Sequence, residues 1–192
     1  MPSRRDWIKG AGIQFGALAW PSALVPSLCH AELVPSLREP RTLMGTLVDI
    51  ALESPHPDRL QPALNAAYRE MTRLSDMMNH YSPTSAVSAI NAAAGIAPVA
   101  IESELMQVLQ MAQAVSHRSQ GCFDITVASI KGWRFSNEAR SMPSPADIAR
   151  QLPLVDYRQL VLNARAQTAF LKRQGMRIDL GGIAKIYILD AG

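Results

Sequence analysis

The sequence predicts a single domain of mixed α/β (α+β) class. Two long stretches, at 60–78 and 102–119, place their apolar residues on one helical face, and short β-rich segments stand before and after them. No internal repeat or low-complexity tract divides the 192 residues. A chain of this length suits one domain with its own hydrophobic core.

The first 31 residues predict a secretory signal peptide that is removed from the mature protein. Arg4, Arg5 and Lys9 precede a weakly apolar run, and Ala31 is a small residue at the end of that run. The paired arginines also suit the twin-arginine route, with the general secretory route as the alternative. We therefore expect an exported, periplasmic protein.

Two other interpretations of this segment fit its residues less well. A membrane anchor needs about 18 consecutive apolar residues, and Gln14, Pro21 and Pro26 interrupt the run. A lipoprotein signal ending at Cys29 would need a small residue before it, where Leu28 stands. Cleavage near residue 31 is the interpretation that the residues favour.

Charge and cysteine content argue against nucleic-acid binding and against an intrachain disulfide in the chain that follows residue 31. The formal net charge is +3, and residues 1–31 hold three basic and one acidic side chain, so the remainder carries +1. This balance gives no electrostatic footprint for nucleic acid. Cys122 is the only cysteine after residue 31, so no intrachain disulfide is expected.

The first half of the domain is predicted to contain a linker, a strand and three helices. Residues 32–40 hold two prolines and predict a linker, and 42–52 favour a strand. Short and long helices are expected at 85–93 and 102–119, and Gly121 stands where the long helix should end. The clearest helix lies before them, with one apolar face formed by Leu60, Leu64, Ala67, Met71, Leu74 and Met78.

The second half is predicted to alternate strands with one more helix. Ser144, Pro145 and Asp147 form a favourable helix start, and that helix should stop at Pro153. Apolar residues alternate in the first candidate strand of this half. The candidate strands are 123–127, 160–162, 169–172 and 176–180.

Three polar segments are hard to explain by core packing, and the first is 177–185. There Asp179 lies at the end of a predicted strand, and Gly181 and Gly182 form a turn before a new helix. Glycines let the backbone approach a ligand, and the amide end of a helix attracts phosphate. The alternative for Asp179 is a role as a turn or cap residue.

The second polar segment is 119–127. Asp124 either faces a binding cleft or serves as an acidic turn residue. No histidine or other activating group directly adjoins Cys122 in sequence, so we predict a small buried thiol there instead of a nucleophile.

The third polar segment, 78–85, separates two predicted helices. Tyr81 is a candidate for stacking on a planar ligand or for hydrogen bonding through its hydroxyl. His80 is predicted to be a surface or capping residue. His56 and His117 lack partners at metal-ligand spacing, so no zinc site is expected.

Four short motifs, read in order, carry a family resemblance. They are Met-Gly-Thr at 44–46, Leu-Ser-x-x-x-x-x-Tyr-Ser-Pro at 74–83, Gly-x-Phe-Asp-Ile-Thr-Val at 121–127 and Asp-Leu-Gly-Gly-Ile-Ala-Lys at 179–185. Their combination resembles the ApbE family of FAD:protein FMN transferases. The resemblance spans about 41–190 here and corresponds to roughly the first half of a complete family member.

The resemblance implies a chemistry and a set of contacts. Family members bind FAD and Mg²⁺ and move FMN onto a threonine of a target protein, releasing AMP; their targets include membrane-associated redox subunits. Gly182 matches a metal-binding position and would contribute its backbone carbonyl. The positions that match FAD contacts are Met44, Tyr81, Cys122, Phe123, Asp124, Asp179 and Lys185.

Two departures from the family pattern qualify this expectation. Ile186 and Ile188 stand where the family has a glycine and a small residue, and β-branched side chains crowd a close approach. The family's downstream carboxylate and hydroxyl Mg²⁺ ligands have no counterpart before Gly192.

We therefore expect an ApbE-like, T-fold-like domain at 41–192 that is incomplete at its C-terminus. The alternatives to a transferase are a non-catalytic periplasmic flavin-binding module and an inactive truncated remnant.

Overall fold

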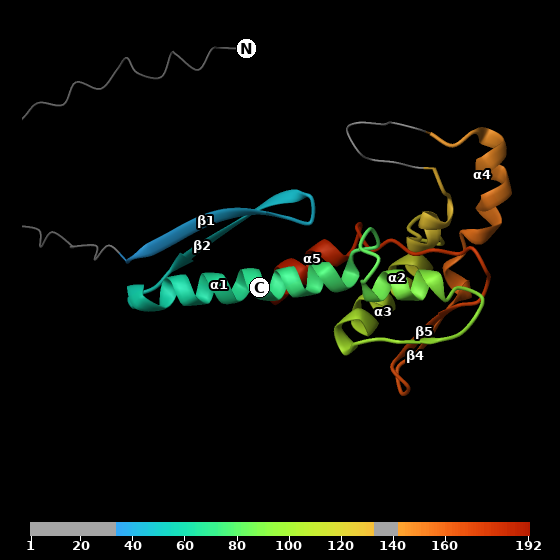
Figure 1. The fold of residues 1–192 in the computed structure, drawn as a ribbon. Helices are drawn as coiled ribbons and strands as arrows, with labels where there is room; N and C mark the ends of the chain where they lie inside the picture. Colours follow the sequence, from blue (N-terminus) through green and yellow to red (C-terminus); the bar gives the residue numbers. More distant parts are fainter. Residues whose placement is uncertain (1–33, 133–141) are drawn as a thin grey trace, which may run out of the picture. The chain divides into compact units, whose positions relative to one another are not determined.

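The computed structural model describes residues 34–132 and 142–192, so the predicted signal peptide lies outside the described residues. The described residues fall within one compact unit, Val34–Gly192, of mixed α/β class as predicted (Figure 1). In chain order its α-helices and strands are β1 (Ser36–Leu43), β2 (Thr46–Glu53), α1 (Pro57–Met78), α2 (Ala86–Ala92), β3 (Val99–Ala100), α3 (Ser103–Arg118), α4 (Pro145–Gln151), β4 (Leu160–Asn163), β5 (Thr168–Leu171) and α5 (Ala184–Ala191).

The fold begins with an antiparallel hairpin formed by β1 and β2, in which Leu43 pairs with Thr46. Met44 and Gly45 make the two-residue turn, with φ angles of 54° and 67°. Positive φ at both central residues matches the natural twist of a tight hairpin. The Met-Gly-Thr motif therefore lies at a chain reversal.

The hairpin corrects two predictions. The linker expected at 32–40 is wrong for its last five residues, which belong to β1, and the strand expected at 42–52 is interrupted by the turn. Pro40 is tolerated because each strand of a two-stranded sheet has a free edge, where a missing N–H costs little.

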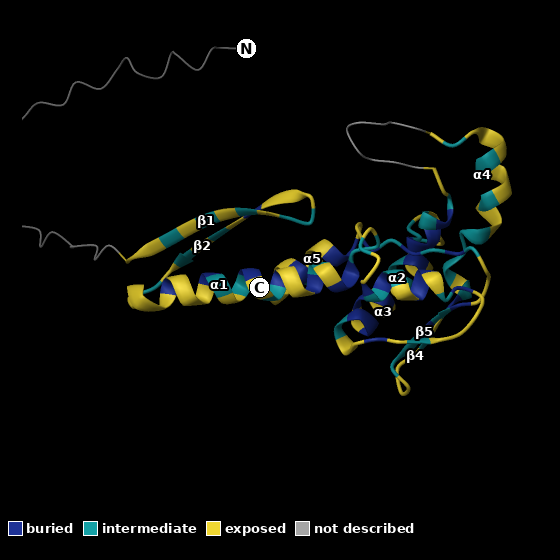
Figure 2. Ribbon diagram, in the orientation of Figure 1, coloured by how far each residue is buried: buried dark blue, intermediate teal, exposed yellow. Residues whose placement is uncertain are grey.

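Helix α1 packs its apolar face against the hairpin and the interior (Figure 2). Ala67 is only half-buried, and Tyr68 beside it is almost fully buried. The Tyr68 hydroxyl lies 2.5 Å from the Glu39 carbonyl oxygen and 2.9 Å from that of Val48, so it ties the helix to both strands. The predicted face is confirmed at Leu60, Leu64, Met71, Leu74 and Met78.

Helices α2, α3 and α4 occur where the sequence predicts them. The Ser85 and Ser144 hydroxyls cap α2 and α4 by accepting hydrogen bonds from backbone amides in the first turn. Helix α3 ends in a Schellman motif, in which the Gly121 amide donates to the Ser116 carbonyl at 2.8 Å. Gln120, at φ 54°, occupies the left-handed position that precedes Gly121.

A second sheet has three antiparallel strands in the order β3-β5-β4. The expected strands at 160–162 and 169–172 correspond to β4 and β5, and β3 is a two-residue strand that the sequence does not predict. Residues 123–127 do not form the expected strand, because a 3-10 helix, Ile125–Ser129, begins there under an Asp124 cap.

The segment 176–180 is extended and alternately buried, yet it belongs to no sheet. Its backbone pairs instead with the side chain of Asn91, the hydroxyl of Ser129 and the carbonyl of Ile125. The strand expected here is therefore wrong as a sheet member, because two side chains and one backbone carbonyl satisfy backbone groups that a neighbouring strand would otherwise pair. A turn at 181–183 follows and opens α5, which packs against α1.

Within residues 34–132 and 142–192, no helix is long and apolar enough to cross a membrane.

Candidate functional site

A pocket of about 440 Å³ lies where the hairpin turn, the end of α1 and the start of α5 meet. Its walls combine apolar side chains with both signs of charge. It is lined by Met44, Gly45, Ser75, Met78, Asn79, His80, Tyr81, Asp179, Leu180, Gly181, Ala184, Lys185 and Ile188. These residues bring together three of the four sequence motifs.

Met44 reaches the pocket because the hairpin turn places it there in a left-handed backbone conformation. A residue with a side chain is disfavoured at positive φ, and such conformations concentrate at functional sites. Gly45 completes the turn, and a Cβ added to it would meet no atom within 4 Å. Backbone geometry, and not crowding, therefore favours glycine at this position.

Asp179 lies in the pocket wall, where one of its oxygens accepts a hydrogen bond and also contacts a histidine ring. The Gly181 amide donates to Asp179 Oδ1 at 2.7 Å, and His80 Nδ1 lies 3.0 Å from the same atom. The predicted turn role of Asp179 is thus confirmed, and the same residue also faces the pocket.

Tyr81 is the most exposed aromatic ring of the pocket wall, with 74% of its surface accessible. Its ring packs on His80, with the two ring centroids 3.8 Å apart. The Tyr81 backbone amide donates a hydrogen bond to Asn79 Oδ1 at 2.9 Å. A ring held by its neighbours but accessible to solvent suits stacking on a planar ligand.

Lys185 stands in the first turn of α5, whose N-terminus has no side-chain cap. Uncapped amides at a helix N-terminus carry a partial positive charge and favour anions. Lys185 makes no ion pair with any described carboxylate, and it lines the pocket together with Ala184. This end of the pocket is therefore suited to a phosphate group.

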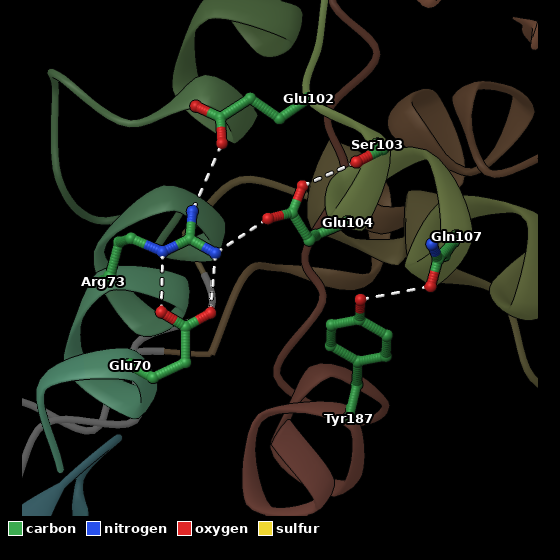
Figure 3. A network of polar contacts seen from close by, with 7 residues as sticks. All are labelled: Glu70, Arg73, Glu102, Ser103, Glu104, Gln107 and Tyr187. Atoms are coloured by element: carbon green, nitrogen blue, oxygen red, sulfur yellow. Dashed lines mark hydrogen bonds and ion pairs between the residues drawn. The ribbon is translucent and has the colours of Figure 1, made fainter. Parts of the chain in front are cut away.

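A polar network joins α1, α3 and α5 outside the pocket (Figure 3). Arg73 on α1 pairs with Glu70 at 2.7 Å, Glu102 at 3.3 Å and Glu104 at 2.7 Å. On α5, the Tyr187 hydroxyl donates to Gln107 of α3 at 3.1 Å. These contacts help to place α5, and with it Lys185.

The network shifts the ionisation of its members. The hydrogen bond from Arg73 lowers the pKa of the Glu70 carboxyl. The pKa of Glu104 is lowered by its own backbone amide first, then by the Ser103 hydroxyl and by Arg73. Burial, followed by the nearby Glu104 charge, raises the pKa of the Tyr187 hydroxyl.

The predicted site residues divide into two groups. Met44, Tyr81, Asp179 and Lys185 all line the pocket, whereas the residues of the 119–127 segment do not. The link between the groups is Gly182, where an added Cβ would lie 3.4 Å from the Phe123 ring. FAD contacts at the residues of both groups, and metal binding at Gly182, stay predictions.

Two residues of the 119–127 segment take structural positions. Asp124 Oδ1 accepts from the Thr126 amide at 2.8 Å and Oδ2 from the Tyr157 amide at 2.9 Å, as expected of a turn residue. The buried thiol predicted at Cys122 is wrong, because the turn that leaves α3 exposes that side chain.

His80 is the pocket residue whose role the sequence did not reveal. It was expected at the surface or as a cap, but its side chain is only 16% exposed and contacts Asp179. The two residues are far apart in the chain, so no local spacing could have indicated the pair. Ser75 and Asn79, at the end of α1, also line the pocket, although the sequence assigns neither of them a ligand contact.

The described residues do not by themselves make a magnesium cage. Mg²⁺ prefers near-octahedral oxygen ligation. In the parts of the chain that the structure describes, no three His, Cys, Asp or Glu side chains are grouped so that they could hold a metal ion. Gly182 offers one carbonyl, and Asp179 Oδ1 already accepts from the Gly181 amide and lies 3.0 Å from His80 Nδ1.

The fold and the pocket together define a single mixed α/β domain whose site combines a carboxylate, a lysine and an accessible aromatic ring. The sequence model of the ApbE family matches residues 44–192, and the chain belongs to the ApbE family. The resemblance found in the sequence motifs is thereby confirmed.

Two curated relatives and one solved structure illustrate the similarity. FAD:protein FMN transferase of Klebsiella pneumoniae is 32% identical over 149 residues, which cover 77% of this chain and 46% of that protein. The Treponema pallidum protein of the same name is 29% identical over 175 residues, covering 88% and 46%. The ApbE protein of Thermotoga maritima superposes with a TM-score of 0.74 at 26% identity, covering 81% of this chain and 50% of that one. This chain therefore spans about half the length of the relatives it matches.

Proposed function

We propose that this chain forms the flavin-nucleotide-binding part of an FAD:protein FMN transferase. The observation that carries the proposal is the convergence of Met44, Tyr81, Asp179 and Lys185 in one pocket, although they come from three separate stretches of the chain. The two curated relatives described above are named for the transfer of FMN from FAD to a protein. Family membership and pocket chemistry thus point to the same ligand.

Three kinds of chemical group in FAD have suitable partners in the pocket. The exposed Tyr81 ring suits stacking on an aromatic ring of the nucleotide. The pyrophosphate suits Lys185 and the uncapped amides of α5. Asp179 accepts hydrogen bonds, so it would bind an N–H or hydroxyl group and repel the phosphates. The nucleotide would therefore lie with its phosphates toward α5.

In the proposed reaction, the hydroxyl oxygen of a target threonine forms a bond to the FMN phosphorus. The pyrophosphate bond to AMP breaks, AMP leaves, and the hydroxyl proton passes to solvent. Such phosphoryl transfer depends mainly on positioning and on neutralising charge. Mg²⁺ on the pyrophosphate supplies charge neutralisation when it is bound. The Gly182 carbonyl is the ligand we propose from this chain, and the remaining oxygen ligands must come from other groups.

We further propose that the protein acts in the periplasm. The support is the charged, apolar and small-residue order of positions 1–31, which is typical of an export signal. The proposed partner is a protein that carries the acceptor threonine, and membrane-associated redox subunits are the class of partner that the family suggests. The net charge of +1 after residue 31 gives no support to a nucleic acid partner.

A titration of the 192-residue chain with FAD, followed by flavin fluorescence, tests the binding step. We expect saturable binding that weakens in Tyr81→Ala. Thermal unfolding of the variant would show whether the fold is intact, and it should be unchanged because Tyr81 is exposed. Absence of saturable binding by the parent chain would contradict the proposal and favour an inactive remnant.

The transfer step is tested by incubating the chain with FAD, Mg²⁺ and a target that carries the acceptor threonine. Covalent flavin is read by in-gel fluorescence, with a threonine-to-alanine target as the control. Binding with transfer supports the whole reaction. Binding without transfer supports a flavin-binding module that needs further groups for catalysis.

A further inference from the structure

We propose that His80 is a positioning residue, which orients the Asp179 carboxylate so that one of its oxygens is reserved for the bound nucleotide. This inference rests on the proposed function for the identity of the ligand. The contact itself is a property of the protein alone. His80 Nδ1 lies 3.0 Å from Asp179 Oδ1, across the pocket wall that joins the end of α1 to the start of α5.

Two nitrogen atoms approach the same oxygen of Asp179. Oδ1 accepts a hydrogen bond from the Gly181 amide at 2.7 Å, and His80 Nδ1 lies 3.0 Å from the same atom. Contacts on one oxygen from two different residues restrict rotation of the carboxylate about its last bond. In the described parts of the chain no hydrogen bond reaches Oδ2, so this atom can accept a donor from a ligand.

His80 is itself held in place, which makes it an effective support. Its ring packs on Tyr81 at a centroid distance of 3.8 Å and an interplanar angle of 39°. Its carbonyl accepts from the Ser88 hydroxyl at 3.2 Å, which fixes the backbone to α2. With 16% of its side chain exposed, His80 has little freedom to leave Asp179.

The arrangement gives the nucleotide a preferred orientation. A carboxylate oxygen accepts an N–H or hydroxyl group and repels phosphate. Lys185 is the oppositely charged residue of the pocket, and together with the amides of α5 it attracts phosphate. By fixing Asp179, His80 would help to separate the hydroxyl-binding and phosphate-binding sides of the site.

Two substitutions separate the functions of the His80 side chain. His80→Asn places an amide group near the position of Nδ1 and so retains a donor, but it removes the ring. His80→Phe keeps a ring against Tyr81 and removes the donor. We expect His80→Phe to weaken FAD binding roughly fivefold, the typical effect of one lost hydrogen bond, and His80→Asn to recover most of that loss. Equal affinity of His80→Phe and the parent chain, or equally weak binding by both variants, would overturn the proposal.

A measurement without flavin tests the contact directly. Long-range ¹H–¹⁵N spectra of the histidine rings report which nitrogen of His80 carries the proton. We expect a protonated Nδ1 in the full chain and a changed ring spectrum in Asp179→Asn, with the signals of the distant His117 unchanged as an internal control. An unchanged His80 spectrum would overturn the proposal. If the parent chain fails to bind FAD, the proposed function fails, while these spectra still decide whether His80 orients Asp179.

Discussion

The side-chain amide of Asn91 forms hydrogen bonds with both the backbone amide and the backbone carbonyl of Ile178. Its Oδ1 accepts from the Ile178 amide at 2.7 Å, and its Nδ2 donates to the Ile178 carbonyl at 3.1 Å. Asn91 is buried on α2, and Ile178 is fully buried in the extended segment that leads to Asp179. One side chain thus replaces a neighbouring strand at the point where the chain enters the pocket.

We expect Asn91→Ala to lower the free energy of unfolding by about 2–3 kcal/mol, because it leaves two buried backbone groups without partners. FAD binding should weaken as well, since Asp179 follows Ile178 directly. Urea unfolding and flavin titration measure the two effects. The matched control is Gln110→Ala, an exposed amide on α3, which should change neither quantity. A loss of stability below about 0.5 kcal/mol in Asn91→Ala would contradict the assigned role.

The Arg73 network should make stability depend on pH. Folding lowers the pKa of Glu70 and Glu104, so both carboxylates stabilise the fold above their ordinary value of 4.5, and this contribution is lost as pH falls through the lowered values. Arg73→Gln should therefore reduce the melting temperature at pH 7, and the difference from the parent should shrink toward pH 3.

The control for this series is Arg69→Gln, which removes an exposed arginine from the same helix. It should melt close to the parent chain across the whole pH range. High salt should also reduce the effect of Arg73→Gln, because exposed ion pairs are screened. An equal effect of the two substitutions at pH 7 would mean that the network adds no stability.

Met44→Asn should stabilise the hairpin and weaken flavin binding. Asparagine tolerates positive φ better than methionine, and Asn-Gly is a favoured two-residue turn, so the gain is on the order of 1 kcal/mol. The substitution also removes an apolar side chain from the pocket wall. The free energy of unfolding should rise while the affinity for FAD falls. A parallel change in both would show that Met44 affects binding only through the turn.

Lys185→Gln should weaken FAD binding roughly fivefold and make it less sensitive to salt, because one charge near the phosphates is lost. The same substitution at Lys172, an exposed lysine that does not line the pocket, provides the control. Titrations at low and high salt measure both effects. Equal salt dependence in the two variants would place the phosphates away from α5.

The sequence by itself determined the elements that depend on local chemistry. The apolar spacing of α1 and α3 and the capping serines of α2 and α4 are visible in short windows, because helix periodicity and capping act within a few residues. The turn at 181–183 and the family motifs are local for the same reason. Four residues that belong to those motifs, Met44, Tyr81, Asp179 and Lys185, line the pocket.

Only the tertiary structure decided which distant residues meet. The sequence predicts a strand that runs through the Met44 turn, because apolar residues continue on both sides of it. The segment before Asp179 was predicted to join a sheet, yet Asn91 satisfies its backbone. His80 gained its role from Asp179 in the same way. Hydrogen bonds between residues far apart in the chain leave no periodic pattern, so folding alone brings such partners within reach of one another.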